Sequence, residues 1–188
     1  MRVIAGKYRS RRLQSLPGLD LRPTADRLRE TLFDVLTAGN PAALEGTVWI
    51  DLYAGTGAVG IEALSRGAAN VYFVENSRRA ADLIGKNLAS LQIQAGFRII
   101  HRDSSHALRE LEAEGIAVDF VFLDPPYRVP QAYQHTLGTL AGSKLLKATT
   151  VIVAEHQKKF DPGGTIASLQ RYRLLEQGDA ALSFYRRS

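Results

Sequence analysis

Cysteine is absent from this sequence of 188 residues, which excludes disulfide bonds and thiolate metal sites. Its four histidines are scattered along the chain without the spacing of metal ligands, so we expect no metal centre. No apolar run approaches the roughly 20 residues that a membrane-spanning helix requires. The N-terminus is basic but has no long apolar stretch behind it, unlike a secretory signal. We therefore expect a cytoplasmic protein with no membrane partner.

Acidic residues are outnumbered by basic ones, 19 to 24, which gives a formal net charge of +5 and a pI of about 9.6. Such an excess favours a polyanionic partner, usually nucleic acid. The basic residues gather at the N-terminus, where the first dozen positions contain no acid. The basic residues of this segment are Arg2, Lys7, Arg9, Arg11 and Arg12.

The chain divides into an N-terminal basic extension, residues 1–45, and a main domain, residues 46–188. In the extension, the runs VIAGKY and RRLQSL predict a short β-hairpin that turns at Ser10. Thr24 is the predicted N-cap of a helix that ends near Gly39, because apolar residues recur between them at helical spacing.

Apolar, β-rich runs alternate with helical stretches from residue 47 onward. The runs are VWIDLYA, VYFVEN, FRIIHRD, FVFLDPP and VIVAEH, and the helical stretches are 59–66, 78–91, 105–114 and 131–140. This alternation predicts an α/β, Rossmann-like fold with a mostly parallel seven-stranded sheet covered on both faces. Two strand-like runs around Gly178 and Asp179 predict a C-terminal antiparallel hairpin.

Each of the five apolar runs ends in an acidic residue. These residues are Asp51, Glu75, Asp103, Asp124 and Glu155. Ligands of open α/β sheets bind beyond the carboxyl ends of the strands, so we expect several carboxylates to line one edge. The alternative is that each acid caps the helix that follows it. Clustered carboxylates repel phosphates and favour cations and sugar hydroxyls, which S-adenosylmethionine supplies without a phosphate.

The segment GTGAVG, which begins at Gly55, matches the G-x-G-x-x-G fingerprint, follows a predicted strand and opens a helix. Glu75 stands about 20 residues further on, where an acid binds ribose hydroxyls. These features alone fit NAD as well as S-adenosylmethionine. Asp51, just before the turn, would repel a pyrophosphate and favour a methionine ammonium. A methyltransferase is therefore favoured, and an NAD-dependent oxidoreductase is the alternative.

The segment Asp124-Pro125-Pro126-Tyr127 ends the fourth predicted strand. Its prolines make the backbone rigid and remove N–H donors, so the Pro125 carbonyl and the Asp124 carboxylate are expected to face the crevice. An exocyclic amine can donate both hydrogens to them, which exposes its lone pair in line with a sulfonium methyl. Asp124 would stabilise the growing positive charge, and Tyr127 would stack on a base. The alternative is a rigid turn without a catalytic role.

At these residues the sequence resembles class I S-adenosylmethionine-dependent N-methyltransferases. The likeness rests on DLYAGTG, Glu75, Asp103 and DPPY. It implies that Glu75 binds the ribose, and that Asp103 and the Ser104 backbone bind the adenine. The cofactor site expected on this basis consists of Asp51, Tyr53, Gly55, Thr56, Gly57, Glu75, Asn76, Asp103 and Ser104.

The segments RVIAGKYRSRRL, LRPTADRLRETLFDVL, EALSRGA and GDAALSFYR are similar to the bacterial RsmD-like family. The resemblance implies methylation of the exocyclic N2 amine of a guanine in 16S ribosomal RNA. Because the chain has no room for a large recognition domain, we expect an assembled or partly assembled small subunit as the substrate, and we expect a monomer. The RNA contacts expected on this basis are Arg2, Lys7, Arg9, Arg11, Arg12, Arg22, Thr24, Arg27 and Arg29.

The sequence also allows other interpretations. Arg27 and Arg29 could belong to a solvated helix face, paired with Asp26 and Glu30. D-P-P-Y motifs also serve adenine N6, cytosine N4 and a protein glutamine amide, so the motif does not choose the target. A DNA amine methyltransferase would need a larger recognition region, and an inactive RNA-binding assembly factor would not need an intact Asp124.

Overall fold

The computed structural model describes residues 1–15, 23–126 and 129–188, with the backbone alone at 23–25. Its helices are α1 (Pro23–Leu36), α2 (Ala58–Ser65), α3 (Arg78–Ser90), α4 (Ser104–Ala113) and α5 (Pro130–Gly142). Its strands are β1 (Val48–Leu52), β2 (Asn70–Val74), β3 (Phe97–Ile100), β4 (Val118–Leu123), β5 (Leu146–Gln157), β6 (Thr165–Ile166), β7 (Leu169–Gln177) and β8 (Ala180–Arg187). None of the helices within these ranges is long and apolar enough to cross a membrane.

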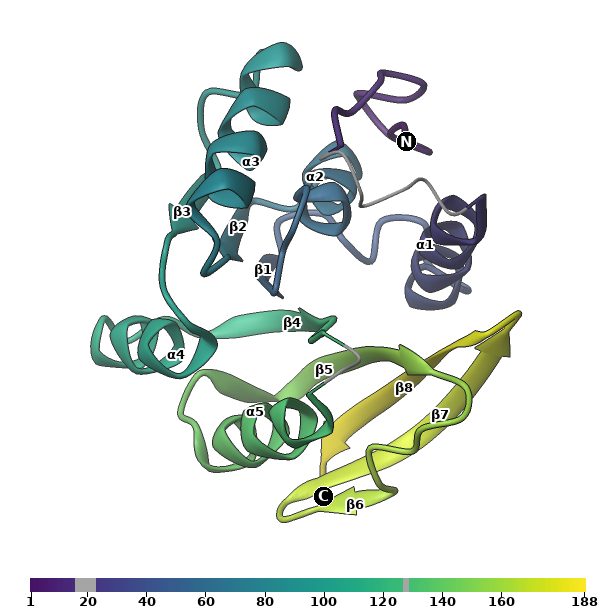
Figure 1. Cartoon of the computed structure of the whole chain (residues 1–188), viewed down its shortest axis with the longest axis vertical. Coiled ribbons are helices and arrows are strands. Elements are labelled where there is room, and N and C mark those ends of the chain that lie inside the picture. Colours follow the sequence, from purple (N-terminus) through teal and green to yellow (C-terminus); the bar gives the residue numbers. More distant parts are fainter. Residues whose placement is uncertain (16–22, 127–128) are drawn as a thin grey trace.

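The described strands form one sheet in the order β3-β2-β1-β4-β5-β8-β7-β6 (Figure 1). The strands from β3 to β5 pair in parallel, whereas β8, β7 and β6 continue the sheet antiparallel. The α/β, Rossmann-like prediction and the C-terminal hairpin, which turns at Gly178 with φ 60°, are confirmed. The sheet has eight strands instead of seven because Thr165–Ile166 adds a two-residue strand, too short to leave a pattern in the sequence.

Helices cover both faces of the sheet, with α1, α2 and α3 on one side and α4 and α5 on the other (Figure 1). Successive residues of β1 point to opposite faces of the sheet. Trp49 packs in the core on the side of α1, α2 and α3, and Ile50 packs in the core on the side of α4 and α5. The predicted helices of the main domain are present, with ends that differ from the prediction by at most two residues. This alternation of inward faces explains why nearly every residue of the central strands is apolar.

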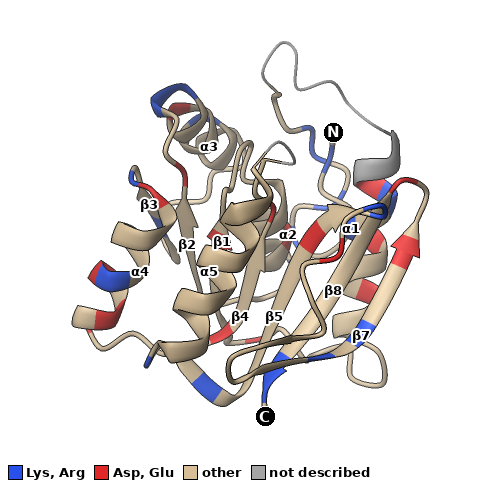
Figure 2. Ribbon diagram, turned by 60° about the horizontal axis from the view of Figure 1, so that its bottom comes forward, with Lys and Arg blue, Asp and Glu red and all other residues tan. Residues whose placement is uncertain are grey.

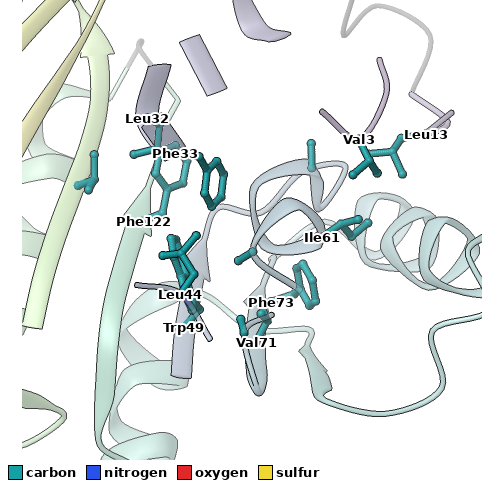
Figure 3. Packing of buried hydrophobic residues seen from close by; sticks show 14 of the residues in the cluster. Val3, Leu13, Leu32, Phe33, Leu44, Trp49, Ile61, Val71, Phe73 and Phe122 are labelled. Carbon is teal, nitrogen blue, oxygen red and sulfur yellow. The ribbon is translucent and has the colours of Figure 1, made fainter. Parts of the chain in front are cut away.

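The N-terminal segment, residues 1–15, folds back on itself and packs onto the outside of α2. The predicted hairpin is reduced to one antiparallel bridge, Arg2 with Arg12, although Ser10 does turn the chain with φ 67°. Val3 and Leu13 are buried over Ile61 of α2 (Figure 3). The segment therefore shares the core of the main domain.

Backbone groups of this segment are held by two side chains of α2. Glu62 is fully buried and accepts from the amides of Ile4 and Ala5 at 2.8 and 2.9 Å. The Ser65 hydroxyl accepts from the amide of Tyr8 at 3.0 Å and donates to the Ala5 carbonyl at 2.5 Å. These bonds satisfy the backbone of a segment that has little regular structure of its own.

Helix α1 begins at Pro23, so Thr24 lies in its first turn and the prediction of Thr24 as the N-cap is wrong. Proline suits this position because the first helical N–H has no partner within the helix. The helix ends at Leu36, before Gly39, as the sequence predicts.

Replacing Glu62 with Gln tests how the N-terminal segment is held. The change puts an amide beside two N–H donors and leaves the buried Arg29 without its nearest buried carboxylate, 3.9 Å away. We expect a loss of about 3–5 kcal/mol in the free energy of unfolding and faster tryptic cleavage within residues 1–15.

Asp82→Asn is the matched control for Glu62→Gln, because Asp82 on α3 is 59% exposed and pairs with the exposed Arg78. Chemical denaturation should show this control to be close to the wild type. A loss below about 1 kcal/mol in Glu62→Gln would contradict the assigned role of this carboxylate.

Candidate active site

The glycine loop leaves β1 through backbone conformations that favour glycine. Gly55 and Gly57 have φ of 55° and 76°, and Tyr53 has φ 60°, an uncommon conformation for an aromatic residue. A Cβ on Gly57 would approach Ile84 to 3.2 Å, and one on Gly60 would lie 2.3 Å from the ring of Phe73. A Cβ on Gly55 would meet only a backbone oxygen at 3.9 Å. Gly57 and Gly60 therefore let α2 pack on β2, whereas Gly55 leaves one side of the loop open to a ligand.

Asp51 holds the glycine loop from below. It is 2% exposed, and its Oδ2 accepts from the amide of Gly60 at 2.9 Å. Burial raises its pKa from 3.8 to about 8, although the bond from Gly60 opposes the shift. The side chain of Asp51 thus stabilises the loop, a role that its position in the sequence did not predict. The predicted contact with a methionine ammonium stays a prediction.

Glu75 connects the glycine loop to the end of β2. One carboxylate oxygen accepts from the amide of Gly55 at 2.9 Å, and the other accepts from the amide of Ser77 at 2.8 Å. Each carboxylate oxygen has a further lone pair, so ribose hydroxyls can still donate to this side chain. This geometry is compatible with the predicted ribose contact. It also shows that Glu75 holds the glycine loop against the end of β2.

A pocket lies at the carboxyl ends of β1, β2 and β3. Its lining residues are Tyr53, Val74, Asn76, Arg102, Asp103, Ser104 and Ser105. Four of them belong to the predicted cofactor site. The Tyr53 hydroxyl bonds with the hydroxyls of Ser104 at 3.0 Å and Thr136 at 2.8 Å, which fixes the ring against α4 and α5. The sequence prediction missed Arg102 and Thr136, because neither lies in a recognisable motif.

Asp103 caps helix α4. Its carboxylate accepts from the amide of His106 at 3.0 Å and bonds with the ring Nδ1 of His106 at 2.5 Å. The bond from the His106 backbone is the main reason why the pKa of Asp103 is lowered. The helix-cap alternative thus describes a real contact, but the side chain also lines the pocket and is 53% exposed. The predicted adenine contact stays a prediction.

The Asp124-Pro125 corner lies beside the glycine loop because β4 pairs directly with β1. Leu123 is in register with Leu52, and the amide of Asp124 donates to the Leu52 carbonyl at 3.4 Å. Asp124 is partly exposed, whereas Pro125 is buried and its carbonyl accepts from the Tyr133 hydroxyl at 3.4 Å. The two motifs therefore share one edge of the sheet, as the sequence predicts. Tyr127 lies outside the described residues.

The prediction of five acids along one edge is only partly correct. Asp51 lies within β1 and is buried. Glu155 lies within β5, two residues before its end, because it pairs with Leu182 of β8, although it follows Ala154, which is level with the last residue of β4, Leu123. Glu75, Asp103 and Asp124 remain at the carboxyl ends of their strands.

The predicted RNA contacts fall into three groups: exposed residues, residues outside the described ranges, and the buried Arg29. Arg2, Lys7, Arg9, Arg11, Arg12 and Arg27 are exposed. Figure 2 shows Lys and Arg of this segment around the N-terminus. Arg22 and the side chain of Thr24 lie outside the described residues.

Arg29 is wrong as an RNA contact. It is 5% exposed, and its guanidinium donates to the Arg2 carbonyl at 2.5 Å and to Asp26 at 3.1 Å. Burial lowers its pKa, although Asp26 and Glu62 oppose the shift. This arginine joins α1, α2 and the N-terminal segment from within, and the solvated-face alternative fails for it as well.

No group of three or more His, Asp or Glu side chains within the described ranges could hold a metal ion. The open Gly55, the pocket beside Tyr53 and the surrounding carboxylates instead suit an organic ligand without phosphate. This combination of sheet, loop and corner defines a class I methyltransferase fold.

The chain belongs to the family described as Conserved hypothetical protein 95, whose family model matches residues 1–186. It is 33% identical over 187 residues to Ribosomal RNA small subunit methyltransferase D of Escherichia coli, covering 100% of this chain and 90% of that protein. The solved structure of yhhF from Escherichia coli matches with a TM-score of 0.82 and 29% identity, covering 100% and 98% of the two chains.

A more distant solved structure, SMU.776 in complex with SAH, has a TM-score of 0.69 and 13% identity. The match covers 88% of this chain and 50% of that one. This likeness concerns the fold, which the two proteins share despite their low sequence identity.

Asp51→Asn tests the buried carboxyl through the pH dependence of stability. Between pH 4 and about 8 the folded state keeps a proton that the unfolded state releases, so the stability contributed by this proton falls as pH rises. Asn still accepts from Gly60 but does not titrate. We expect the variant to gain stability relative to the wild type by up to about 1.4 kcal/mol per pH unit across this window.

Urea unfolding at pH 5, 6.5 and 8 measures this difference, with the exposed-site variant Asp82→Asn as control. The control should follow the wild type at every pH. Parallel curves for Asp51→Asn and the wild type would show that Asp51 is ionised in the folded state at pH 5.

Proposed function

We propose that this protein transfers a methyl group from S-adenosylmethionine to the exocyclic N2 amine of a guanine in 16S ribosomal RNA. The observation that carries the proposal is the adjacency of the glycine loop and the Asp124-Pro125 corner at one edge of the sheet. The relative named Ribosomal RNA small subunit methyltransferase D supports the choice of RNA. The substrate is a small subunit or its precursor, and the enzyme acts as a cytoplasmic monomer.

The cofactor lies along the carboxyl ends of β1, β2 and β3 in this proposal. Glu75 accepts from the ribose hydroxyls, and the pocket of Tyr53, Asn76, Asp103 and Ser104 holds the adenine. S-adenosylmethionine supplies an electrophilic methyl group to this site. NAD suits this site less well, because its pyrophosphate would lie beside the Glu75 carboxylate at Gly55.

Asp124 and Pro125 orient the amine. Its two hydrogens are donated to the Asp124 carboxylate and the Pro125 carbonyl, which holds the nitrogen lone pair toward the methyl group. The Pro125 carbonyl keeps a lone pair for this bond beside its long contact with Tyr133. Asp124 stabilises the positive charge that grows on nitrogen, and either Asp124 or water accepts the proton. Tyr127 stacks on the base after it has left the RNA helix.

The exposed basic residues of the N-terminal segment and Arg27 bind RNA phosphates, together with Arg22 and Thr24. Arg29 has no part in this surface because it is buried. Among the described residues no separate recognition domain is present, so the shape of a ribonucleoprotein particle supplies much of the specificity.

S-adenosylmethionine is expected to raise Tm in a concentration-dependent way, and NAD is expected to have no effect. Only a ligand that binds the folded state stabilises it by mass action. Differential scanning fluorimetry with each compound tests this choice. Stabilisation by NAD alone would replace the methyltransferase by an oxidoreductase.

Asp124→Asn is expected to lower the rate of methyl transfer by about 100-fold or more, because the charge that stabilises the transition state is lost. The assay supplies methyl-labelled S-adenosylmethionine with small-subunit RNA, free or in particles, and identifies the modified nucleoside as N2-methylguanosine. Glu45→Gln is the control, since this exposed carboxylate precedes β1 at the opposite edge of the sheet. Detection of N6-methyladenosine would overturn the assignment of guanine as the target base. Full activity of Asp124→Asn would overturn the mechanism.

A further inference from the structure

Asn87 on α3 joins two segments that are distant in sequence. Its side chain is fully buried and accepts from the amide of Gln14 at 2.8 Å. Its Nδ2 donates to the Gln14 carbonyl at 3.1 Å and to the Thr56 carbonyl at 3.0 Å. One side-chain amide thus binds the basic N-terminal segment and the glycine loop at the same time.

Both bonded segments carry function in the proposal above. Thr56 stands between Gly55 and Gly57 in the loop, and Gln14 follows the exposed Arg11 and Arg12. The two hydrogens on Asn87 Nδ2 are donated to two different carbonyls, those of Gln14 and Thr56. If either bond is lost, a buried polar group is left unsatisfied.

A second contact links the same two segments, since the Thr56 hydroxyl donates to the sulfur of Met1 at 3.7 Å. Figure 1 shows the N-terminal segment next to α2, the helix that follows the glycine loop. Met1, at one end of the segment, therefore contacts Thr56 directly, and Gln14, near the other end, contacts it through Asn87.

We propose that Asn87 is a positioning residue that couples cofactor binding in the glycine loop to the ordering of the basic N-terminal segment. This proposal rests on the proposed function, which identifies the two ligands as S-adenosylmethionine and RNA. A cofactor that rigidifies the loop reduces the freedom that the segment must lose when RNA binds, and the reverse effect is equal by linkage. The segment thus becomes a better RNA surface when the methyl donor is in place.

Asn87→Asp is the variant that separates coupling from packing. Asp has the same shape and still accepts from the Gln14 amide, but it offers no N–H, and a proton retained on the buried carboxyl could serve only one of the carbonyls of Gln14 and Thr56. Thr150→Val is the matched control. Thr150 is also buried and its hydroxyl also bonds to backbone, at Lys147 and Val118, far from the loop in the sequence and the fold.

Hydrogen exchange of the whole protein, with and without S-adenosylhomocysteine, gives the first measurement. In the wild type and in Thr150→Val, the cofactor product should slow exchange of amides in residues 3–14 by about 5-fold or more. In Asn87→Asp the slowing should fall below about 2-fold, while protection of the loop itself remains. Equal slowing in Asn87→Asp and the control would overturn the coupling. Asn87→Ala, which removes all three bonds, should behave as Asn87→Asp does and is used if the latter fails to fold.

RNA affinity gives the second measurement. In the wild type, S-adenosylhomocysteine should lower the Kd for small-subunit RNA by about 5-fold or more, and this factor should approach one in Asn87→Asp. An unchanged factor would overturn the coupling. If the wild type binds S-adenosylhomocysteine but no RNA, the proposed substrate is wrong, and the exchange measurement still decides the role of Asn87.

Discussion

The site depends on the way two acidic side chains hold the glycine loop. Asp51 accepts from Gly60 below the loop, and Glu75 accepts from Gly55 at its outer end. Their bonds fix the backbone on both sides of Thr56 in a conformation with three positive φ angles. Such a conformation persists only where the surroundings determine it. Because β1 pairs with β4, the same fixed loop also sets the distance to Asp124.

The N-terminal segment is also held in place by side chains of the main domain. It has one β-bridge and several turn hydrogen bonds of its own, and Glu62, Ser65 and Asn87 of the main domain satisfy further backbone groups. A segment held through backbone groups can present all of its basic side chains to solvent. The chain thereby obtains a defined cationic surface beside the active-site edge without a separate recognition domain.

Local patterns in the sequence are enough to predict the strands, helices and both motifs, because each depends on neighbouring residues. They fail where partners come from elsewhere in the chain. The sequence places Glu155 at the end of an apolar run, but pairing with β8 extends β5 past it. Arg29 looks like one of several exposed helix cations, yet the returning segment and Glu62 bury it. Asn87 and Thr136 are single polar residues within helices, so no spacing distinguishes them.

The acids at the sheet edge combine two tasks that at first conflict. A carboxylate that holds a loop is already hydrogen-bonded, whereas a carboxylate that binds a ligand needs acceptor capacity. Glu75 resolves the conflict because each of its oxygens accepts one backbone N–H and retains a lone pair. Ribose hydroxyls then bind an oxygen whose position the protein has already fixed. Ligand binding at such a group requires little reorganisation, so the energy of the contact contributes to affinity instead of to ordering the loop.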